Sequence, residues 1–282
     1  MPDNYAYEAV EGWGLGSDGR PFGGVVPDVA VNSSDTVYIT RREPPAILVY
    51  DRDGTFLRTF ADEILTNPHN IWIDSDDQIY VADTDDHTIR KFNTAGTLIQ
   101  TWGTQNETGQ PGDPFNRPTK AMAPPTGHLF VSDGYGQHRI HRFSPDGDHE
   151  LSWGEEGTGP SQFALPHDLW VDSRDRVLVT DRENHRIQLF DLDGQFLEEW
   201  RNVESPNNIH ITEDDLLYLA EAPRRVSIFD LDGNLLHRWG EKGDGAGQYV
   251  DYPHGICVDS RGDIYVTEVP FQPDRLQKFA RI

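Results

Sequence analysis

The chain has 282 residues and a formal net charge of −24, from 24 Lys+Arg against 48 Asp+Glu. So acidic a surface repels phosphate groups, which argues against general binding to nucleic acid or to anionic membranes. The single cysteine, Cys257, excludes an intramolecular disulfide and a cysteine-based metal site.

The N-terminal residues 1–14 have no basic region followed by an apolar one, so we expect no signal peptide. No apolar run approaches the roughly 18 residues of a membrane-spanning helix. We therefore expect a soluble, cytoplasmic protein with no membrane partner. The oligomeric state stays open, and the sequence is compatible with a monomer.

A unit of about 40 residues recurs six times along the chain, which is the period of a four-stranded propeller blade. Each unit opens with a proline two or three residues before an apolar strand, at Pro27, Pro68, Pro118, Pro166, Pro206 and Pro253. A polar turn and a second short strand follow, at 36–40, 78–82, 128–132, 176–180, 216–220 and 263–267. Their β-branched and aromatic composition indicates strands.

Third strands are predicted at 46–50, 88–92, 139–143, 186–190, 225–229 and 275–279. In five units a turn containing glycine then leads to a fourth strand, because glycine accepts the positive φ of a tight hairpin. These fourth strands end in an aromatic residue, at Phe60, Trp102, Trp153, Trp200 and Trp239.

The sixth unit has no fourth strand of its own, because the chain stops at Ile282. Residues 5–14 end in Trp13-Gly14, as Trp239-Gly240 does, and would complete the last blade and close the ring. The prediction is an all-β, single-domain six-bladed propeller over residues 1–282. Its blades span about 25–66, 67–115, 116–163, 164–204, 205–251, and 252–282 plus 1–24.

Histidine follows the opening proline in alternate units only, as His69, His167 and His254. The first strand of a propeller blade lines the central channel, so these three imidazoles should point inward from three evenly spaced directions. Three nitrogen ligands with an open fourth position are the pattern of a catalytic Zn²⁺ site. Alternatively, Pro-His is a common start for a propeller strand, with the ring bonded to neighbouring backbone.

The end of each second strand should reach the same mouth of the channel. Five units have an acid there, at Asp83, Asp133, Asp181, Glu221 and Glu268, and we expect these acids to bond backbone amides. Arg42 and Arg182 share the next position in opposite blades, where two guanidiniums suit capture of a carboxylate. The alternative for both is a surface arginine paired with nearby acids.

Tyr135 lies between Gly134 and Gly136, which we expect to free the backbone so that the ring is presented to the channel. A phenol beside a divalent cation and two guanidiniums loses its proton more easily, and would then act as a general base. The alternative is an aromatic packing residue in a loop.

The repeats are similar to NHL repeats. The Pro-His starts, residues 131–140 (VSDGYGQHRI) and residues 180–188 (TDRENHRIQ) together resemble peptidyl-α-hydroxyglycine α-amidating lyase over nearly the whole chain. That family is a six-bladed propeller which holds Zn²⁺ by three channel histidines and cleaves a C–N bond to give an amide and glyoxylate.

The resemblance implies zinc ligands at His69, His167 and His254, a base at Tyr135, and catalytic or substrate-binding arginines at Arg182 and Arg42. It also implies a small-molecule or peptide substrate with an α-hydroxyglycine-like group. The family binds a structural Ca²⁺ through an Asp after the last histidine. Here that position is Gly255, which argues against the calcium site.

Two alternatives from other classes remain open. A non-catalytic NHL scaffold would bind a protein or peptide over one face and would need no metal. A lactonase-like hydrolase would use acidic and Asn ligands for Ca²⁺, and the three histidines speak against it.

Overall fold

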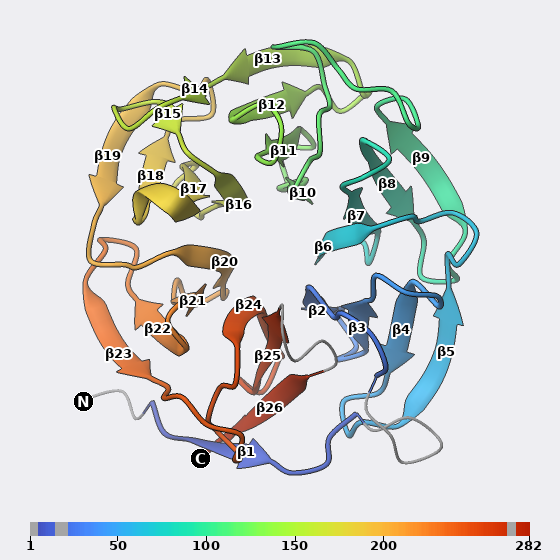
Figure 1. Ribbon diagram of the computed structural model, residues 1–282, viewed down its shortest axis with the longest axis vertical. Coiled ribbons are helices and arrows are strands. Elements are labelled where there is room, and N and C mark those ends of the chain that lie inside the picture. The colour runs from blue at the N-terminus through green and yellow to red at the C-terminus, as the bar shows by residue number, and fades with distance from the viewer. Residues whose placement is uncertain (1–4, 15–21, 270–274) are drawn as a thin grey trace.

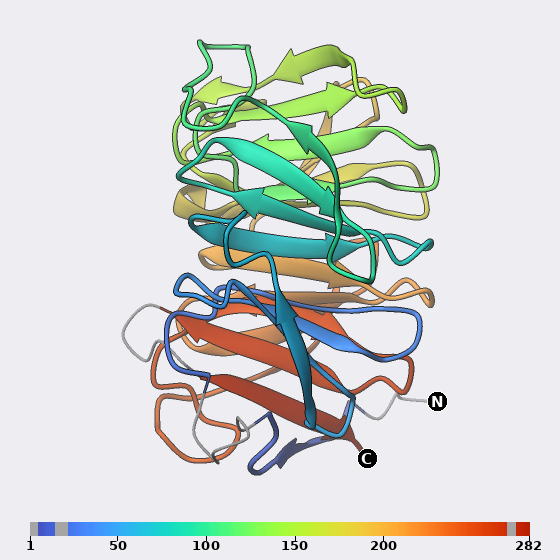
Figure 2. The same cartoon turned by 90° about the vertical axis from the view of Figure 1, so that its right-hand side faces the viewer.

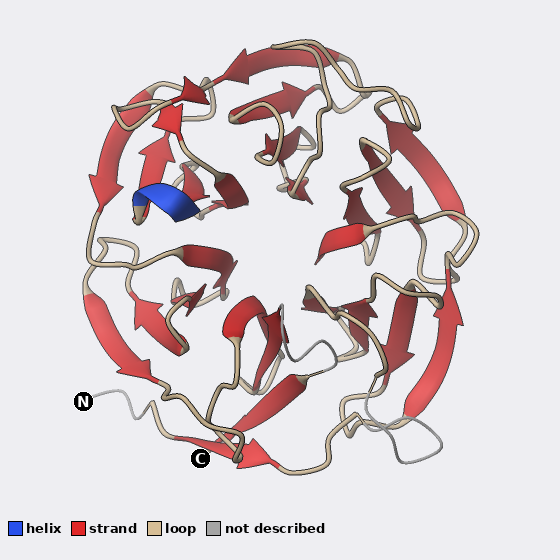
Figure 3. Ribbon diagram, in the orientation of Figure 1, coloured by secondary structure: helices blue, strands red, loops and turns tan. Residues whose placement is uncertain are grey.

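The computed structural model of the protein describes residues 5–14, 22–269 and 275–282. Within those ranges the strands form six four-stranded antiparallel sheets, arranged as blades around a central axis (Figure 1). Turned by 90°, the ring shows strands that run between its two faces (Figure 2). The predicted all-β six-bladed propeller is confirmed, and the helix seen in Figure 3 is a single 3-10 turn, η1 (Arg182–Asn184).

The first three blades follow the chain from the axis outward. Blade one consists of β2 (Val29–Val31), β3 (Val37–Thr40), β4 (Ile47–Tyr50) and β5 (Phe56–Phe60). Blade two consists of β6 (Pro68–Ile73), β7 (Ile79–Asp83), β8 (Thr88–Phe92) and β9 (Leu98–Trp102). Blade three consists of β10 (Lys120–Met122), β11 (Leu129–Asp133), β12 (Arg139–Phe143) and β13 (His149–Trp153).

A short parallel pair, β14 (Glu155–Glu156) and β15 (Gln162–Phe163), links blades three and four. Blade four consists of β16 (Pro166–Val171), β17 (Val177–Asp181), β18 (Arg186–Phe190) and β19 (Phe196–Trp200). Blade five consists of β20 (Pro206–Ile211), β21 (Leu217–Glu221), β22 (Arg225–Phe229) and β23 (Leu235–Trp239). Blade six consists of β24 (Tyr252–Val258), β25 (Ile264–Val269), β26 (Leu276–Arg281) and β1 (Tyr7–Val10).

The N-terminal strand closes the ring, as predicted. β1 pairs antiparallel with β26, with Tyr7 opposite Arg281 and Val10 opposite Lys278. The predicted strand over 5–14 was too long, because the chain turns after Val10 and Trp13 lies beyond the strand. Residues 1–4 and 15–21 of the predicted blade-six segment lie outside the described residues.

At five junctions within the described chain, an aromatic residue of one blade lies against a hairpin glycine of the next. A Cβ added at Gly96, Gly147, Gly194 or Gly233 would approach within 2.7–3.4 Å of Phe60, Trp102, Trp153 or Trp200, the aromatic end of the preceding blade. Gly54 lies against Trp13 in the same way. Trp13 lies beyond strand β1, in the turn that follows it. There it makes, between blades six and one, the same aromatic–glycine contact that joins the first five blades.

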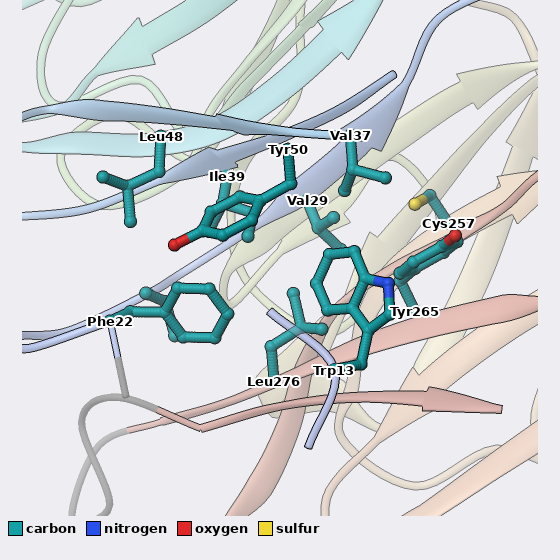
Figure 4. Packing of buried hydrophobic residues seen from close by; sticks show 11 residues of the cluster. Trp13, Phe22, Val29, Val37, Ile39, Leu48, Tyr50, Cys257, Tyr265 and Leu276 are labelled. Atoms are coloured by element: carbon teal, nitrogen blue, oxygen red, sulfur yellow. The ribbon is translucent and has the colours of Figure 1, made fainter. Parts of the chain in front are cut away.

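Trp13 also joins the first and last blades through its ring. It lies 5.7 Å from the Tyr50 ring of blade one and 5.1 Å from the Tyr265 ring of blade six, and its Nε1 donates to the Arg52 carbonyl at 2.8 Å. Phe22 and Leu276 fill the space around it (Figure 4). Burial of this cluster stabilises the closed ring, because it removes apolar surface of both blades from water.

The acids at the ends of the second strands bond backbone amides, as predicted. Asp83 accepts from the amides of Thr66 and Asn67 at 2.6 and 2.7 Å, and Asp181 from those of Ala164 and Leu165 at 2.9 and 3.2 Å. Asp133, Glu221 and Glu268 each accept a corresponding amide in their own blades. These bonds fix the backbone directly before the inner strands, where the Pro-His pairs lie.

No helix within the described ranges is long and apolar enough to cross a membrane.

Replacing Gly194 with Ala should destabilise the protein by about 3 kcal/mol, because the new methyl combines a positive φ with overpacking against Trp153. Gly112→Ala is the matched control: its φ is also positive, at +93°, but its Cβ would meet nothing within 4 Å. The control should lose only about 1 kcal/mol. Denaturant unfolding of both variants measures the difference, and equal losses would contradict the locking role of the glycine.

Candidate functional site

Three histidines meet on the propeller axis. His69, His167 and His254 start the inner strands β6, β16 and β24 of blades two, four and six, and all three are buried. Their ring centroids lie 4.8, 5.1 and 4.8 Å apart, and one ligand atom from each lies within 4.8 Å of the other two. The structure thus brings together the three residues that the alternation singled out.

Each imidazole is oriented by a carbonyl of the following blade. Nδ1 of His69 donates to the Thr119 carbonyl at 3.0 Å, that of His167 to Asn207 at 2.7 Å, and that of His254 to Pro27 at 2.7 Å. Because a carbonyl only accepts, the proton is on Nδ1 and the lone pair is on Nε2. A second group that fixes the tautomer in this way is typical of metal-binding histidines.

Burial keeps the three rings neutral. It is the largest cause that lowers the pKa of His254 to about 3, and it also holds the pKa values of His69 and His167 well below the usual value. Positive charge nearby acts in the same direction, since Arg182 lowers the pKa of His167 and Arg42 that of His69. Neutral imidazole is the form that binds a metal ion, so the site is ready for one at neutral pH.

Tyr135 brings its hydroxyl to the histidines. The phenol oxygen lies 3.1 Å from Nε2 of His69 and 3.2 Å from Nε2 of His167. The flanking glycines have a different role from the predicted one, because neither has a positive φ. A Cβ at Gly134 would lie 2.1 Å from the Pro166 carbonyl, so glycine is required there for close approach to blade four.

The two predicted arginines line the same cavity as Tyr135 and His254, which has a volume of about 510 Å³. Arg41 is excluded from this role, because its guanidinium donates to the carbonyls of Phe22 and Gly23 at 2.5 and 2.9 Å. Arg42 Nε is buried and makes no hydrogen bond within the described chain. Arg182 pairs with the neighbouring Glu183 at 2.9 Å.

The sequence predicted no chemical role for the remaining wall of the cavity. It comes from blades four, five and six: Glu183, Glu204, Ser205, Asn207, Ala222, Pro223, Tyr252 and Val269. Most of these residues directly precede an inner strand or follow a second strand, which are the same two columns that supplied the histidines and arginines. Their location at the channel mouth could therefore be predicted from the repeats. Their residue types do not repeat from blade to blade, so the sequence indicated no chemical role for them.

The first repeat was aligned wrongly by one residue, because Pro27 was matched to the prolines that precede the histidines. Pro27 itself takes the place of the histidines, because its carbonyl accepts from both His254 Nδ1 and Thr267 Oγ1. Asp28 then corresponds to Asp168, since the amide of each donates to a threonine hydroxyl of its second strand. Asp28 therefore lies one position after the histidine position, as Asp168 does in blade four.

Three buried neutral imidazoles are a suitable donor set for Zn²⁺ or another divalent transition metal. Among the residues that the structure describes, this is the group of His, Cys, Asp or Glu side chains whose ligand atoms gather closely enough to hold an ion. Its three members are all histidines, unlike the acidic set of a calcium-dependent lactonase.

Comparison with known proteins finds NHL repeats in three stretches of the chain. The NHL repeat model matches residues 65–92, 163–190 and 251–279. Human NHL repeat-containing protein 3 is 36% identical over 213 residues, covering 68% of this chain and 60% of that protein. A probable peptidyl-alpha-hydroxyglycine alpha-amidating lyase of Caenorhabditis elegans is 29% identical over 148 residues, covering 51% of this chain and 42% of that protein.

The chain thus spans less than two thirds of the length of these relatives. Among solved structures, virginiamycin B lyase from Staphylococcus aureus superposes with a TM-score of 0.64 at 17% identity, covering 92% of this chain and 95% of that one. At this identity the likeness shows the fold alone.

His167→Ala should abolish stoichiometric metal binding, because the variant keeps only two of the three imidazole ligands. Elemental analysis after dialysis should give about one equivalent of transition metal for the parent protein and less than about one tenth for the variant. His128→Ala is the control, since His128 lies at the surface beside Glu150. Full metal retention in His167→Ala would count against the site.

Proposed function

We propose that this chain, an NHL-repeat propeller that resembles the peptidyl-α-hydroxyglycine α-amidating lyases, is a metal-dependent carbon–nitrogen lyase. The observation that carries the proposal is the Tyr135 hydroxyl, which lies within 3.2 Å of two of three convergent histidines, in a cavity with two arginines. A tyrosine that only packs in a loop would not require its hydroxyl to lie beside histidines and arginines.

The substrate is an N-acyl or peptidyl α-hydroxyglycine, and the products are an amide and glyoxylate. Its carboxylate matches Arg42 and Arg182, because a guanidinium binds a carboxylate through two parallel hydrogen bonds. Arg42 Nε is buried without a partner, which costs free energy until an acceptor arrives. The cavity of about 510 Å³ has room for the acyl part beyond the reacting carbon.

Zinc is the proposed metal, held by Nε2 of His69, His167 and His254. When bound it would supply positive charge that favours loss of the substrate hydroxyl proton. The three carbonyl-bonded Nδ1 groups keep the rings in the orientation and tautomer that this role requires.

Tyr135, as the phenolate, accepts the proton of the substrate hydroxyl. The oxygen lone pair forms the C=O bond of glyoxylate, and the electrons of the C–N bond pass to the amide nitrogen. That nitrogen gains a proton, which Tyr135 can return, so the base is regenerated. Arg42 and Arg182 hold the carboxylate during this change and stabilise the negative charge on the reacting group.

A non-catalytic scaffold is the rival from another class. The name of the human relative, NHL repeat-containing protein 3, states no activity. The scaffold reading requires no metal and predicts that changes at Tyr135 leave partner binding intact. The buried, neutral histidines favour the lyase, since buried polar rings serve no purpose in binding a partner over an outer face.

Tyr135→Phe should lower kcat/KM for glyoxylate release from α-hydroxyhippurate by about 10²–10⁴-fold, because it removes the proton acceptor but retains the ring. The metal content should stay at the parental value, since the hydroxyl is not needed as a protein ligand. Tyr38→Phe, on the second strand of blade one, is the control. Parental activity of Tyr135→Phe would contradict the base, and an inactive parent protein holding full metal would favour another substrate.

Arg182→Gln should lower kcat/KM by about 10–100-fold, because a charge-assisted hydrogen bond to the carboxylate is lost. Substrate analogues without the carboxylate should bind both proteins equally well. Arg174→Gln provides the control, as Arg174 pairs with the exposed Asp232. Steady-state kinetics measures kcat/KM, and an unchanged value for Arg182→Gln would show that this arginine does not bind the substrate carboxylate.

A further inference from the structure

A second buried polar layer crosses the channel next to the histidines. Lys120 of blade three reaches between Asp28 of blade one and Asp168 of blade four, with its Nζ 3.6 Å from a carboxylate oxygen of each. All three residues are at most 3% exposed. Lys120 Nζ also donates to the Ile71 carbonyl of blade two at 3.2 Å, so one side chain of blade three contacts blades one, two and four.

The two carboxylates are held in place by the backbone. Asp28 Oδ2 accepts from the Ile71 amide at 2.9 Å, and Asp168 Oδ2 from the Ile209 amide at 2.6 Å. Asn70 Nδ2 donates to Asp168 Oδ1 at 3.4 Å. Neither acid can turn away from the axis without losing these bonds, so both carboxyl groups are held within the channel.

The calcium site implied by the resemblance does not fit this layer. It requires an aspartate where this chain has Gly255, and a Cβ there would lie 2.3 Å from Asp28 Oδ1 and 2.8 Å from Thr267 Oγ1. Asp28 thus fills the space that such a side chain would need. Within the described residues no third acid joins Asp28 and Asp168 to make a closely gathered metal-ligand group.

We infer that the Lys120 ammonium is the structural cation of this channel and takes the place of a divalent metal ion there. A buried ammonium is retained only where opposite charge and hydrogen bonds compensate its desolvation, and both are present. The adjoining cavity, of about 50 Å³, is lined by apolar side chains such as Trp72, Trp170 and Ile256. The inference is independent of the proposed lyase activity.

The first test uses the parent protein. Calcium analysis after dialysis should find less than about one tenth of an equivalent per chain, and millimolar CaCl₂ should leave the melting temperature unchanged. A full equivalent of calcium, or a rise in melting temperature with CaCl₂, would overturn the inference whether or not the protein is a lyase.

The second test removes the charge. Lys120→Met preserves the length of the side chain and should lower the melting temperature by about 10 °C, because it leaves two buried carboxylates without a counter-ion. Asp28 Oδ1 and Asn70 Oδ1 accept no hydrogen bond in the described structure, so they are available to an added cation. We therefore expect CaCl₂ to raise the melting temperature of this variant.

Lys242→Met is the matched control, because Lys242 is exposed, and it should melt within about 1 °C of the parent. Should Lys120→Met fail to fold, the double variant Lys120→Met/Asp28→Asn removes one of the two acids and should fold with a smaller loss. A parental melting temperature for Lys120→Met would contradict the inference.

Discussion

The candidate site depends on one hydrogen bond made three times. Each histidine donates from Nδ1 to a carbonyl at the start of the inner segment of the next blade, at Thr119, Asn207 and Pro27. Blades two, four and six supply the rings, and the blades between them supply the acceptors. This division explains the alternation physically: a histidine in every blade would crowd the axis with six rings, whereas three leave room for an ion and a substrate.

Local patterns were sufficient to predict the blades. Strand alternation, hairpin glycines and terminal aromatics act over a few residues, so the six sheets and the closure by the N-terminal strand could be read from the sequence. The register of blade one could not, because a proline marks the start of an inner strand only to within a residue. Contacts of Pro27 with His254 and Thr267, far along the chain, decide it.

The site was predictable where chemistry repeats and unpredictable where it does not. Histidines in alternate repeats are a pattern, and the structure brings them together. Arg41 and Arg42 are adjacent and alike, and the four carbonyls that bind the Arg41 guanidinium, at Phe22, Gly23, Glu43 and Pro45, turn it away from the cavity. Lys120 gave no signal in the sequence, since its partners Asp28 and Asp168 lie in other blades.

The acidity of the chain has two different uses in the channel. At the second-strand ends, acids bind backbone amides and hold the inner strands, and Asp28 and Asp168 balance the buried Lys120. Neither use attracts an anionic substrate, and the net charge of −24 opposes one. Charges beyond about 8 Å are screened at physiological salt, so the field at the cavity is set by its nearest groups. The cavity is lined by Glu183 and Glu204 as well as by Arg42 and Arg182, so the charges of the two arginines are balanced nearby, and those charges add to burial in keeping the adjacent histidines neutral.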